Sequence, residues 1–327
     1  PFGKAKRALT ADGTYLSPVM GLPVLIQMMW TKRFSRQKAK FSATGLLPHD
    51  VLREGLKEIT SLTNPIIKDI RLLEKKRHRD ETGLFLAEGM KLVIDAMESG
   101  WTIRTLIYAK AGRGQDNVEK LAARCLAQGA DVLIVSEKVL GAIARRDNPQ
   151  MVMGVFEQRW QAPSSVRPAG NDVWVALDRV RDPGNLGTII RTADAAGAKG
   201  VILVGQTTDP FATETVRATM GSVFAMPLSR MSESDFITFA KSWPGIVAGT
   251  HLKGAVDYRK PDYTKEPVLL VMGNEQAGMT DELAEACTTL IKIPQAGRAD
   301  SLNLAIAAGV CLFEVRRHAL TFDGDEA

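Results

Sequence analysis

Three polar segments of the chain carry side chains suited to group-transfer chemistry. The first segment, residues 178–191, is DRVRDPGNLGTIIR; the second, residues 272–278, is MGNEQAG; the third, residues 293–303, is IPQAGRADSLN. Each is associated with an apolar stretch typical of a buried strand. Their amides, hydroxyl, carboxylate and arginine can bind and orient a ligand through hydrogen bonds. The candidate side chains are Asn185, Arg191, Asn274, Glu275, Ser301 and Asn303.

The first segment predicts the start of a helix. Pro183 and Gly184 interrupt the chain just before Asn185, which we expect to cap the helix. Gly187 precedes Arg191 by about one helical turn, which predicts room for the guanidinium and a ligand shared by Asn185 and Arg191. A phosphate-binding turn is an alternative, although the chain contains neither GxGxxG nor GxxxxGKS/T; a plain cap with a surface arginine is another. The apolar stripe of this helix is Leu186, Ile189, Ile190 and Ala193.

The second segment follows the apolar run at residues 268–272. Gly273 predicts a close approach of the backbone, and Gly278 predicts another sharp turn. Asn274 and Glu275 then lie at the carboxyl end of a strand. A β-turn with solvated polar residues is the alternative interpretation.

The third segment leads into residues 304–313, which are apolar on every side. Ser301 is the expected N-cap of a helix over residues 301–320, and Asn303 is expected inside its first turn, where asparagine is unfavourable. A helix this apolar predicts burial in the core and against another subunit. Ser301 and Asn303 are therefore expected at the mouth of a buried site.

The second half of the chain alternates strands and helices, which predicts a parallel sheet covered by helices on both faces. Ligands of such sheets bind beyond the carboxyl ends of the strands, where the polar segments are expected. The expected strands are residues 173–177, 201–204, 246–248, 268–272 and 290–293, and the expected helices are residues 186–196, 213–220, 233–243, 280–286 and 301–320.

The preceding region also has an α/β pattern, beginning with Asn64 as N-cap and Pro65 in the first helical position. Strands are expected at residues 84–87, 102–108, 131–135 and 151–157, and helices at residues 90–98, before Gly129, and at 137–144. We therefore divide the chain into an N-terminal segment (1–49), an α/β domain (50–158), a linker (159–171), a second α/β domain (172–320) and a tail (321–327).

The positive charge is concentrated at the N-terminus. The 327 residues carry a net charge of +5, yet residues 1–49 have eight basic side chains and one acidic one, so the remainder is slightly acidic. A disordered arm that binds nucleic acid, an organellar transit peptide, an over-extended reading frame and a tail without a role all explain this segment. The expected location is the cytoplasm, or the mitochondrion if the segment is a transit peptide.

The sequence offers no sign of a membrane span, a disulfide framework or a metal site. No apolar run approaches the roughly 20 residues that cross a bilayer. Cys125, Cys287 and Cys311 are widely separated, with no CxxC pair, and the histidines are scattered. We therefore predict no metal and a reducing compartment.

Taken together, DPGNLGTIIRTADAAGA, VMGNEQAGM and IPQAGRADSLNLAIAAGV resemble the three motifs of the SpoU (TrmH-like) family of RNA ribose 2′-O-methyltransferases, in the SPOUT superfamily. The resemblance covers residues 172–318. Residues 64–97 also resemble the substrate-binding domain that precedes the catalytic domain in ribosomal-RNA members. The resemblance implies a deep trefoil knot, a rare exception among folds, preceded by a smaller L30e-like RNA-binding domain. It also implies S-adenosylmethionine as methyl donor, RNA as substrate and a homodimer.

The resemblance assigns roles to individual positions. RATMGSVF at residues 217–224 is similar to a family stretch with serine at the position of Thr219, and Gln295 replaces a more usual methionine. The implied catalytic residues are Asn185, Arg191, Glu275, Ser301 and Asn303. The implied donor-binding residues are Thr250, Gly273, Asn274, Glu275, Ile293, Pro294, Ser301, Leu302 and Asn303.

Methylation of a ribose 2′-hydroxyl requires alignment of oxygen, methyl and sulfur, and only RNA carries this hydroxyl. Arginine is a poor base, so we expect Arg191 to position the target phosphate and to lower the pKa of the hydroxyl. A charged stretch before the expected strand at residues 84–87 suggests phosphate contacts, although flanking acids also fit a solvated helix end. The candidate RNA contacts are Lys75, Lys76, Arg77 and Arg79.

Large-subunit (23S-type) ribosomal RNA is the favoured substrate, with transfer RNA as the alternative. A catalytically silent RNA-binding assembly factor is disfavoured because Asn185, Arg191 and Asn303 are all present. A dinucleotide-dependent enzyme is disfavoured by the missing glycine fingerprint.

Overall fold

The computed structural model describes residues 14–16, 38–40, 56–252, 255–298 and 300–321. Of the N-terminal segment it describes two short strands, β1 (Thr14–Leu16) and β2 (Lys38–Lys40), which pair in parallel. The expectations for the rest of residues 1–49 and for residues 322–327 lie outside the described residues.

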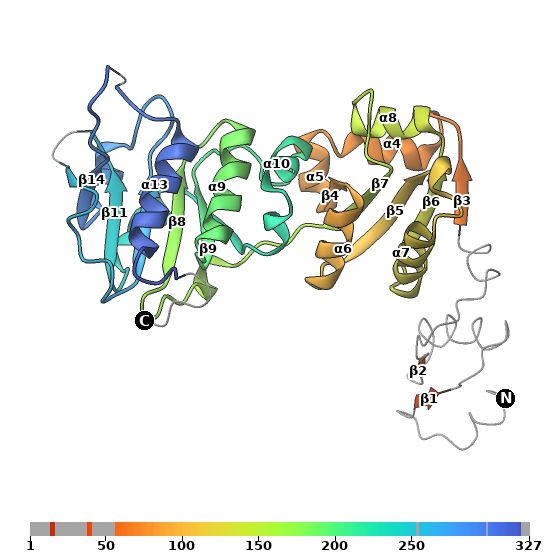
Figure 1. The fold of residues 1–327 in the computed structure, drawn as a ribbon, viewed down its shortest axis with the longest axis horizontal. Helices are drawn as coiled ribbons and strands as arrows, with labels where there is room; N and C mark the ends of the chain where they lie inside the picture. The colour runs from red at the N-terminus through yellow and green to blue at the C-terminus, as the bar shows by residue number, and fades with distance from the viewer. Residues whose placement is uncertain (1–13, 17–37, 41–55, 253–254, 299, 322–327) are drawn as a thin grey trace.

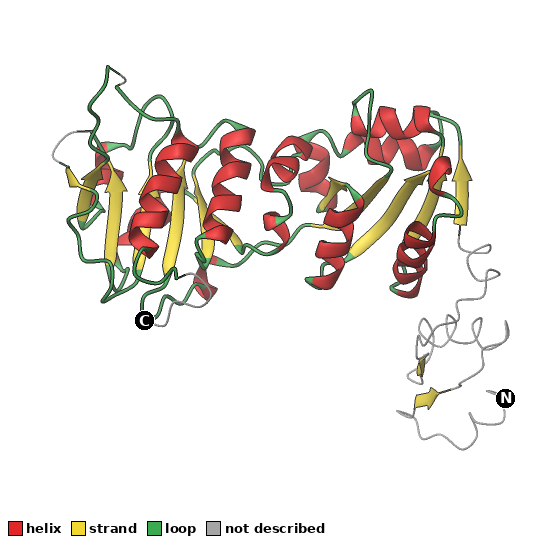
Figure 2. Ribbon diagram, viewed as in Figure 1, coloured by secondary structure: helices red, strands yellow, loops and turns green. Residues whose placement is uncertain are grey.

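The first domain is a five-stranded mixed sheet in the order β3-β6-β5-β7-β4. Helices α4 and α8 cover one face, and α6 and α7 cover the other (Figures 1 and 2). Strand β3 was not predicted, because only Ile59 of its four residues is buried. The strands are β3 (Leu56–Ile59), β4 (Leu84–Glu88), β5 (Ile103–Ala109), β6 (Asp131–Val135) and β7 (Val152–Glu157). The helices are α4 (Pro65–Leu72), α5 (Lys76–Thr82), α6 (Met90–Glu98), α7 (Asp116–Ala127) and α8 (Glu137–Ala144), with the 3-10 turn η1 (Lys110–Gly112).

The second domain is a seven-stranded sheet in the order β10-β9-β8-β13-β11-β14-β12, and every neighbouring pair is parallel. Strands β8 and β13 are buried along their whole length, as predicted for a sheet covered on both faces. The strands are β8 (Val173–Asp178), β9 (Gly200–Val204), β10 (Leu228–Met231), β11 (Ile246–Thr250), β12 (Val256–Asp257), β13 (Val268–Met272) and β14 (Thr289–Lys292).

Helices α9 and α13 pack on one face of this sheet (Figure 1), and α11 and α12 pack on the other. Helix α10 packs against α9, between the two domains (Figure 1). Strand order reverses at β8, because β9 lies on one side of it and β13 on the other. Such a switch point is where open α/β sheets bind their ligands. The elements are α9 (Pro183–Ala195), α10 (Thr213–Thr219), η3 (Ser222–Phe224), α11 (Glu233–Lys241), α12 (Asp281–Glu285) and α13 (Leu304–Arg316).

Sequence reasoning missed the two edge strands β10 and β12. Strand β10 contains Ser229 and Arg230, which break the apolar pattern, and β12 has two residues only. The predicted linker contains η2 (Pro163–Ser165) and packs against β10: Gln161 N donates to Leu228 O at 2.8 Å.

Candidate active site

Helix α9 begins one turn earlier than predicted. Asp182 is its N-cap and accepts a hydrogen bond from Asn185 N at 2.6 Å, with Pro183 in the first helical turn. The prediction that Asn185 caps the helix was therefore wrong. A capping side chain followed by proline also marks the start of α4, where Asn64 is the cap and Pro65 the first helical residue, as predicted. Inside the first turn, the Asn185 side chain is available to face a neighbouring segment.

Gly187 has a different role from the one expected. A Cβ there would lie 2.5 Å from Ala218 Cβ and 2.7 Å from Thr215 O, both in α10. The missing side chain therefore permits close packing of α9 on α10. It does not serve to make room for the Arg191 guanidinium.

The second segment forms a tight loop after β13. Asn274 and Gly278 exchange backbone hydrogen bonds of 3.2 and 3.1 Å, and Gly278 has a φ of +67°. A Cβ on Gly273 would lie 2.7 Å from Met279 N. The predicted close approach at Gly273 and the sharp turn at Gly278 are both confirmed. The Asn274 side chain accepts from Gln276 N and Ala277 N, which fixes the loop between them.

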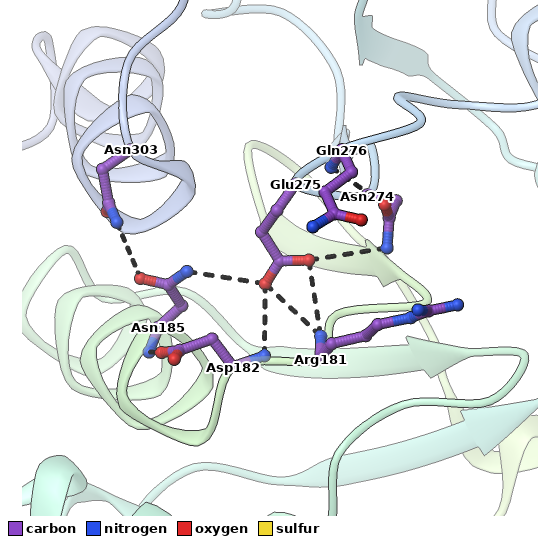
Figure 3. A pocket seen from close by; sticks show the side chains of 7 residues that line it. All are labelled: Arg181, Asp182, Asn185, Asn274, Glu275, Gln276 and Asn303. Atoms are coloured by element: carbon purple, nitrogen blue, oxygen red, sulfur yellow. Dashed lines mark hydrogen bonds between the residues drawn. The ribbon is translucent and has the colours of Figure 1, made fainter.

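Glu275 projects from this loop toward the start of α9 (Figure 3). Its carboxylate accepts from Arg181 N at 3.3 Å, Asp182 N at 3.4 Å and Asn185 Nδ2 at 3.5 Å. These hydrogen bonds are long and individually weak. A negative charge is nevertheless favoured there, because the first amides of a helix have no partners within the helix.

Asn303 joins the third segment to the first. It is the N-cap of α13 and accepts from Ala305 N at 2.9 Å, while its Nδ2 donates to Asn185 Oδ1 at 2.9 Å. The predictions that Ser301 caps this helix and that Asn303 lies inside its first turn were both wrong, because Asn303 is the cap and the helix begins at Leu304. Asn303, Asn185 and Glu275 thus form one hydrogen-bonded chain across the three segments.

These side chains line a cavity of about 320 Å³ at the carboxyl ends of β8 and β13, a size suited to a small ligand. Sequence reasoning missed Arg181, Asp182 and Gln276; the capping signal of Asp182 would have revealed one of them. The full lining is Arg181, Asp182, Asn185, Asn274, Glu275, Gln276 and Asn303 (Figure 3).

The other predicted site residues are not part of the lining of this cavity. Arg191 is exposed on α9, and its guanidinium has no partner among the described residues. Thr250 Oγ1 accepts from Gly273 N at 3.4 Å, which joins the carboxyl ends of β11 and β13. Pro294, Ser301 and Leu302 are exposed, and Ile293 is half-buried.

An ion pair that the sequence did not indicate supports the second segment. Asp178 is fully buried at the end of β8 and accepts from Arg179 Nε and Nη2 at 2.9 and 2.7 Å. Arg179 in turn donates to Gly278 O at 3.3 Å, and its carbonyl accepts from Asn274 Nδ2 at 2.8 Å. The hydrogen bonds to Asp178 raise the pKa of Arg179 above its ordinary value, so this support stays charged.

The expected RNA contacts divide into two groups. Lys75, Lys76 and Arg77 are exposed, although Lys76 pairs with Asp80 and Arg77 with Glu81 one helical turn away. Arg79 is 3% exposed. Its guanidinium pairs with Asp209 and donates to Leu73 O and Glu74 O. The prediction that Arg79 contacts RNA was wrong, because all this hydrogen bonding takes place inside the protein.

Three further features of the described residues concern thiols, metal ligands and membrane spans. Burial raises the pKa of the Cys125, Cys287 and Cys311 thiols to about 12, so they stay protonated. Within the described ranges no group of three or more His, Cys, Asp or Glu side chains is arranged to hold a metal ion. No helix among the described residues has the length and apolar character of a membrane span.

Comparison with known proteins identifies the family. Residues 172–313 match the SpoU rRNA Methylase family, and residues 64–154 match the MRM3-like substrate binding domain. The chain is 31% identical over 261 residues to the Bacillus subtilis 23S rRNA (guanosine-2′-O)-methyltransferase RlmP, across 80% of this chain and 100% of that protein. The chain belongs to the SpoU rRNA methylase family.

Solved structures agree with this SpoU assignment. An rRNA methyltransferase from Sinorhizobium meliloti is 60% identical, with a TM-score of 0.78 over 82% of this chain and 100% of that one. A second structure of a Sinorhizobium meliloti rRNA methyltransferase, 61% identical, is described as AdoMet-bound. The SpoU methyltransferase AviRb from Streptomyces viridochromogenes is 31% identical, with a TM-score of 0.68 over 78% of this chain and 97% of that one.

Proposed function

We propose that this chain transfers a methyl group from S-adenosylmethionine to a ribose 2′-hydroxyl of large-subunit ribosomal RNA. The observation that carries the proposal is the chain of hydrogen bonds from Asn303 through Asn185 to Glu275, which joins all three SpoU segments at one edge of the sheet. Family membership and the rRNA substrates of the relatives support ribosomal RNA over transfer RNA.

The residues around the cavity suit the methyl donor. Leu302 is 38% exposed, and with Ile293 it offers apolar surface for an adenosine. Thr250, Gly273 and Pro294 place loop backbone at the ends of neighbouring strands, which suits the polar ends of such a molecule. Bound there, S-adenosylmethionine would supply an electrophilic methyl group on a positively charged sulfur.

The protein's own residues then have to orient the ribose. Asn185 and Asn303 are neutral and hydrogen-bonded to each other, so they can hold a hydroxyl without adding charge. Arg191 would bind the phosphate of the target nucleotide and favour loss of the 2′ proton. Glu275 would keep the second segment fixed on α9. Orientation of this kind makes the reaction effectively unimolecular.

We also propose three further properties of the molecule that the family assignment supports. Lys75, Lys76 and Arg77 remain candidate contacts to RNA phosphates. A trefoil knot in the C-terminal domain and an L30e-like first domain are the expected folds. A cytoplasmic location fits a ribosomal-RNA substrate.

A homodimer is the expected assembly. Helices α9 and α13 lie side by side (Figure 1), and α13 exposes Ile306 by 56% and Phe313 by 49%. Paired apolar side chains on one helix next to the site favour a second copy of this chain as their cover. Such a dimer would also enclose the otherwise open cavity.

Replacing Phe313 by Asp is expected to dissociate that dimer. Loss of a buried aromatic side chain and burial of a charge together should raise the dimer dissociation constant by at least about 100-fold. Sedimentation equilibrium measures this directly. Leu72→Asp, a similar change at an exposed leucine of α4, should leave the assembly unchanged, and equal association of both variants would exclude the α13 interface.

The catalytic proposal is tested by mapping ribose methylation across total RNA in cells with and without the gene. We expect one 2′-O-methyl group of large-subunit ribosomal RNA to disappear. Loss of a methyl group from transfer RNA would instead support the alternative substrate. An unchanged map would contradict the assignment as an RNA methyltransferase.

A further inference from the structure

Helix α10 lies between the two domains (Figure 1). One buried ion pair and one half-buried ion pair join the segment around this helix to the first domain. Four residues before the helix begins, Asp209 pairs with Arg79 of α5 at 2.6 Å, and the two side chains are 8% and 3% exposed. Asp209 also accepts from Phe211 N at 2.9 Å, and its carbonyl accepts from Thr215 Oγ1 at 3.0 Å. The ion pair therefore holds the beginning of the helix.

The second ion pair holds the last turn of α10. Arg217 Nε donates to Glu88 at 2.7 Å, and Arg217 Nη2 donates to Ala144 O at 3.0 Å. The side chain of Glu88, at the end of β4, is 1% exposed, whereas that of Arg217 is 32% exposed. It also accepts from Gln150 N at 2.8 Å, and Arg146 lies 3.8 Å away. Removal of Arg217 would leave the buried Glu88 carboxylate with only Gln150 N and the more distant Arg146 as partners.

Aromatic packing also joins the two domains. The ring centroids of Phe85, in β4, and Phe211 are 4.8 Å apart, and Trp101 Nε1 donates to Phe224 O at 2.8 Å. Interfaces between domains usually permit relative motion unless they are large and apolar. Two ion pairs, one of them buried, together with an aromatic cluster are the arrangement expected of a fixed orientation.

The same helix also contacts the catalytic helix. Ala218 and Thr215 pack against Gly187 of α9 so closely that a Cβ there would overlap them, and Asn185 lies two residues before Gly187. Contacts therefore run without interruption from Glu88 through Arg217 and α10 to the site. The first domain bears the expected RNA contacts, so its orientation decides where a bound RNA places its ribose.

We propose that Glu88 and Arg217 are positioning residues for methyl transfer, which fix the substrate-binding domain on α10 and so set the place of the target ribose at the cavity. The inference rests on the proposed function. A role in joining the domains explains why Arg217 binds Glu88 and Ala144 O of the first domain. Because a displacement of about 1 Å can cost about 100-fold in rate, a loosened orientation should be visible in the kinetics.

The test compares Arg217→Met and Glu88→Gln with the wild-type full-length chain. With an RNA fragment that contains the mapped target site, each variant should lose about 100-fold in kcat/KM, while the dissociation constant for S-adenosylmethionine stays at the wild-type value. Arg217→Lys keeps the charge and should recover part of the activity. Arg104→Met removes an arginine whose exposed ion pair with Glu157 lies outside the contact with α10, and this control should remain fully active.

Small-angle X-ray scattering supplies a readout that does not depend on catalysis. Arg217→Met should broaden the distribution of interdomain distances, whereas Arg104→Met should not. Unchanged scattering with normal kcat/KM would overturn the inference. An equal loss of donor binding would also overturn it, because the residues would then support the fold in general. If the wild-type chain methylates no RNA, the proposed function fails, and the scattering alone decides the role of the ion pairs.

Discussion

Replacement of Arg191 by alanine is expected to lower the rate of methyl transfer by about 100- to 1,000-fold, the usual effect of removing a group that stabilises charge in the transition state. Arg191 is exposed on α9 and has no partner among the described residues, so its guanidinium is available to a substrate. Its loss leaves the Asn303–Asn185–Glu275 connection untouched. Donor binding should therefore stay near the wild-type value.

Single-turnover methylation with saturating donor and RNA measures this effect. Arg191→Lys should restore little activity, because an ammonium group lacks the planar fork that binds phosphate through two hydrogen bonds. Lys199→Ala removes an exposed basic side chain beyond the other end of α9 and serves as the control for net charge. If Arg191→Ala kept near-normal turnover, the catalytic role of Arg191 would be wrong.

The sequence predicted the central elements well because their signals are local. Strand β13 has the predicted bounds, and β8 differs by one residue, since continuous apolar runs define strands buried on both faces. The convergence of the three segments could be predicted because the carboxyl ends of parallel strands all lie at the same end of the sheet. The hydrogen bond between Asn303 and Asn185, 118 positions apart, confirms it.

Roles that depend on distant partners could not be predicted from local signals. Arg79 lies in a run of charges that resembles a solvated surface, yet its partner Asp209 is 130 positions away. Gly187 was expected to leave room for the Arg191 guanidinium, whereas the atoms that a side chain there would overlap belong to α10. The observed starts of α9 and α13 differ from the predicted ones because the sequence near each start contains more than one residue able to cap a helix, and the sequence does not choose between them.

Replacement of Gly273 by alanine should disable the site through backbone displacement. The new Cβ would lie 2.7 Å from Met279 N and 2.8 Å from Gly278 C, closer than real contacts allow. Both atoms belong to the backbone, so no side-chain rotation relieves the overlap and the loop must open. Glu275 then moves away from Arg181 N and Asp182 N, and Asn274 Nδ2 loses its hydrogen bond to Arg179 O. We expect a loss of about 100-fold or more in methylation and a destabilisation of about 1–3 kcal/mol.

Unlike Arg191→Ala, this variant should also weaken donor binding, because Gly273 lies beside Thr250 at the strand ends proposed to hold S-adenosylmethionine. Calorimetric titration with the donor, together with thermal unfolding, separates the two effects. Gly141→Ala is the matched control, since a Cβ there meets its nearest neighbour at 3.4 Å and alanine favours the helix. Normal donor affinity in Gly273→Ala would place the methyl donor elsewhere and leave this loop to orient RNA alone.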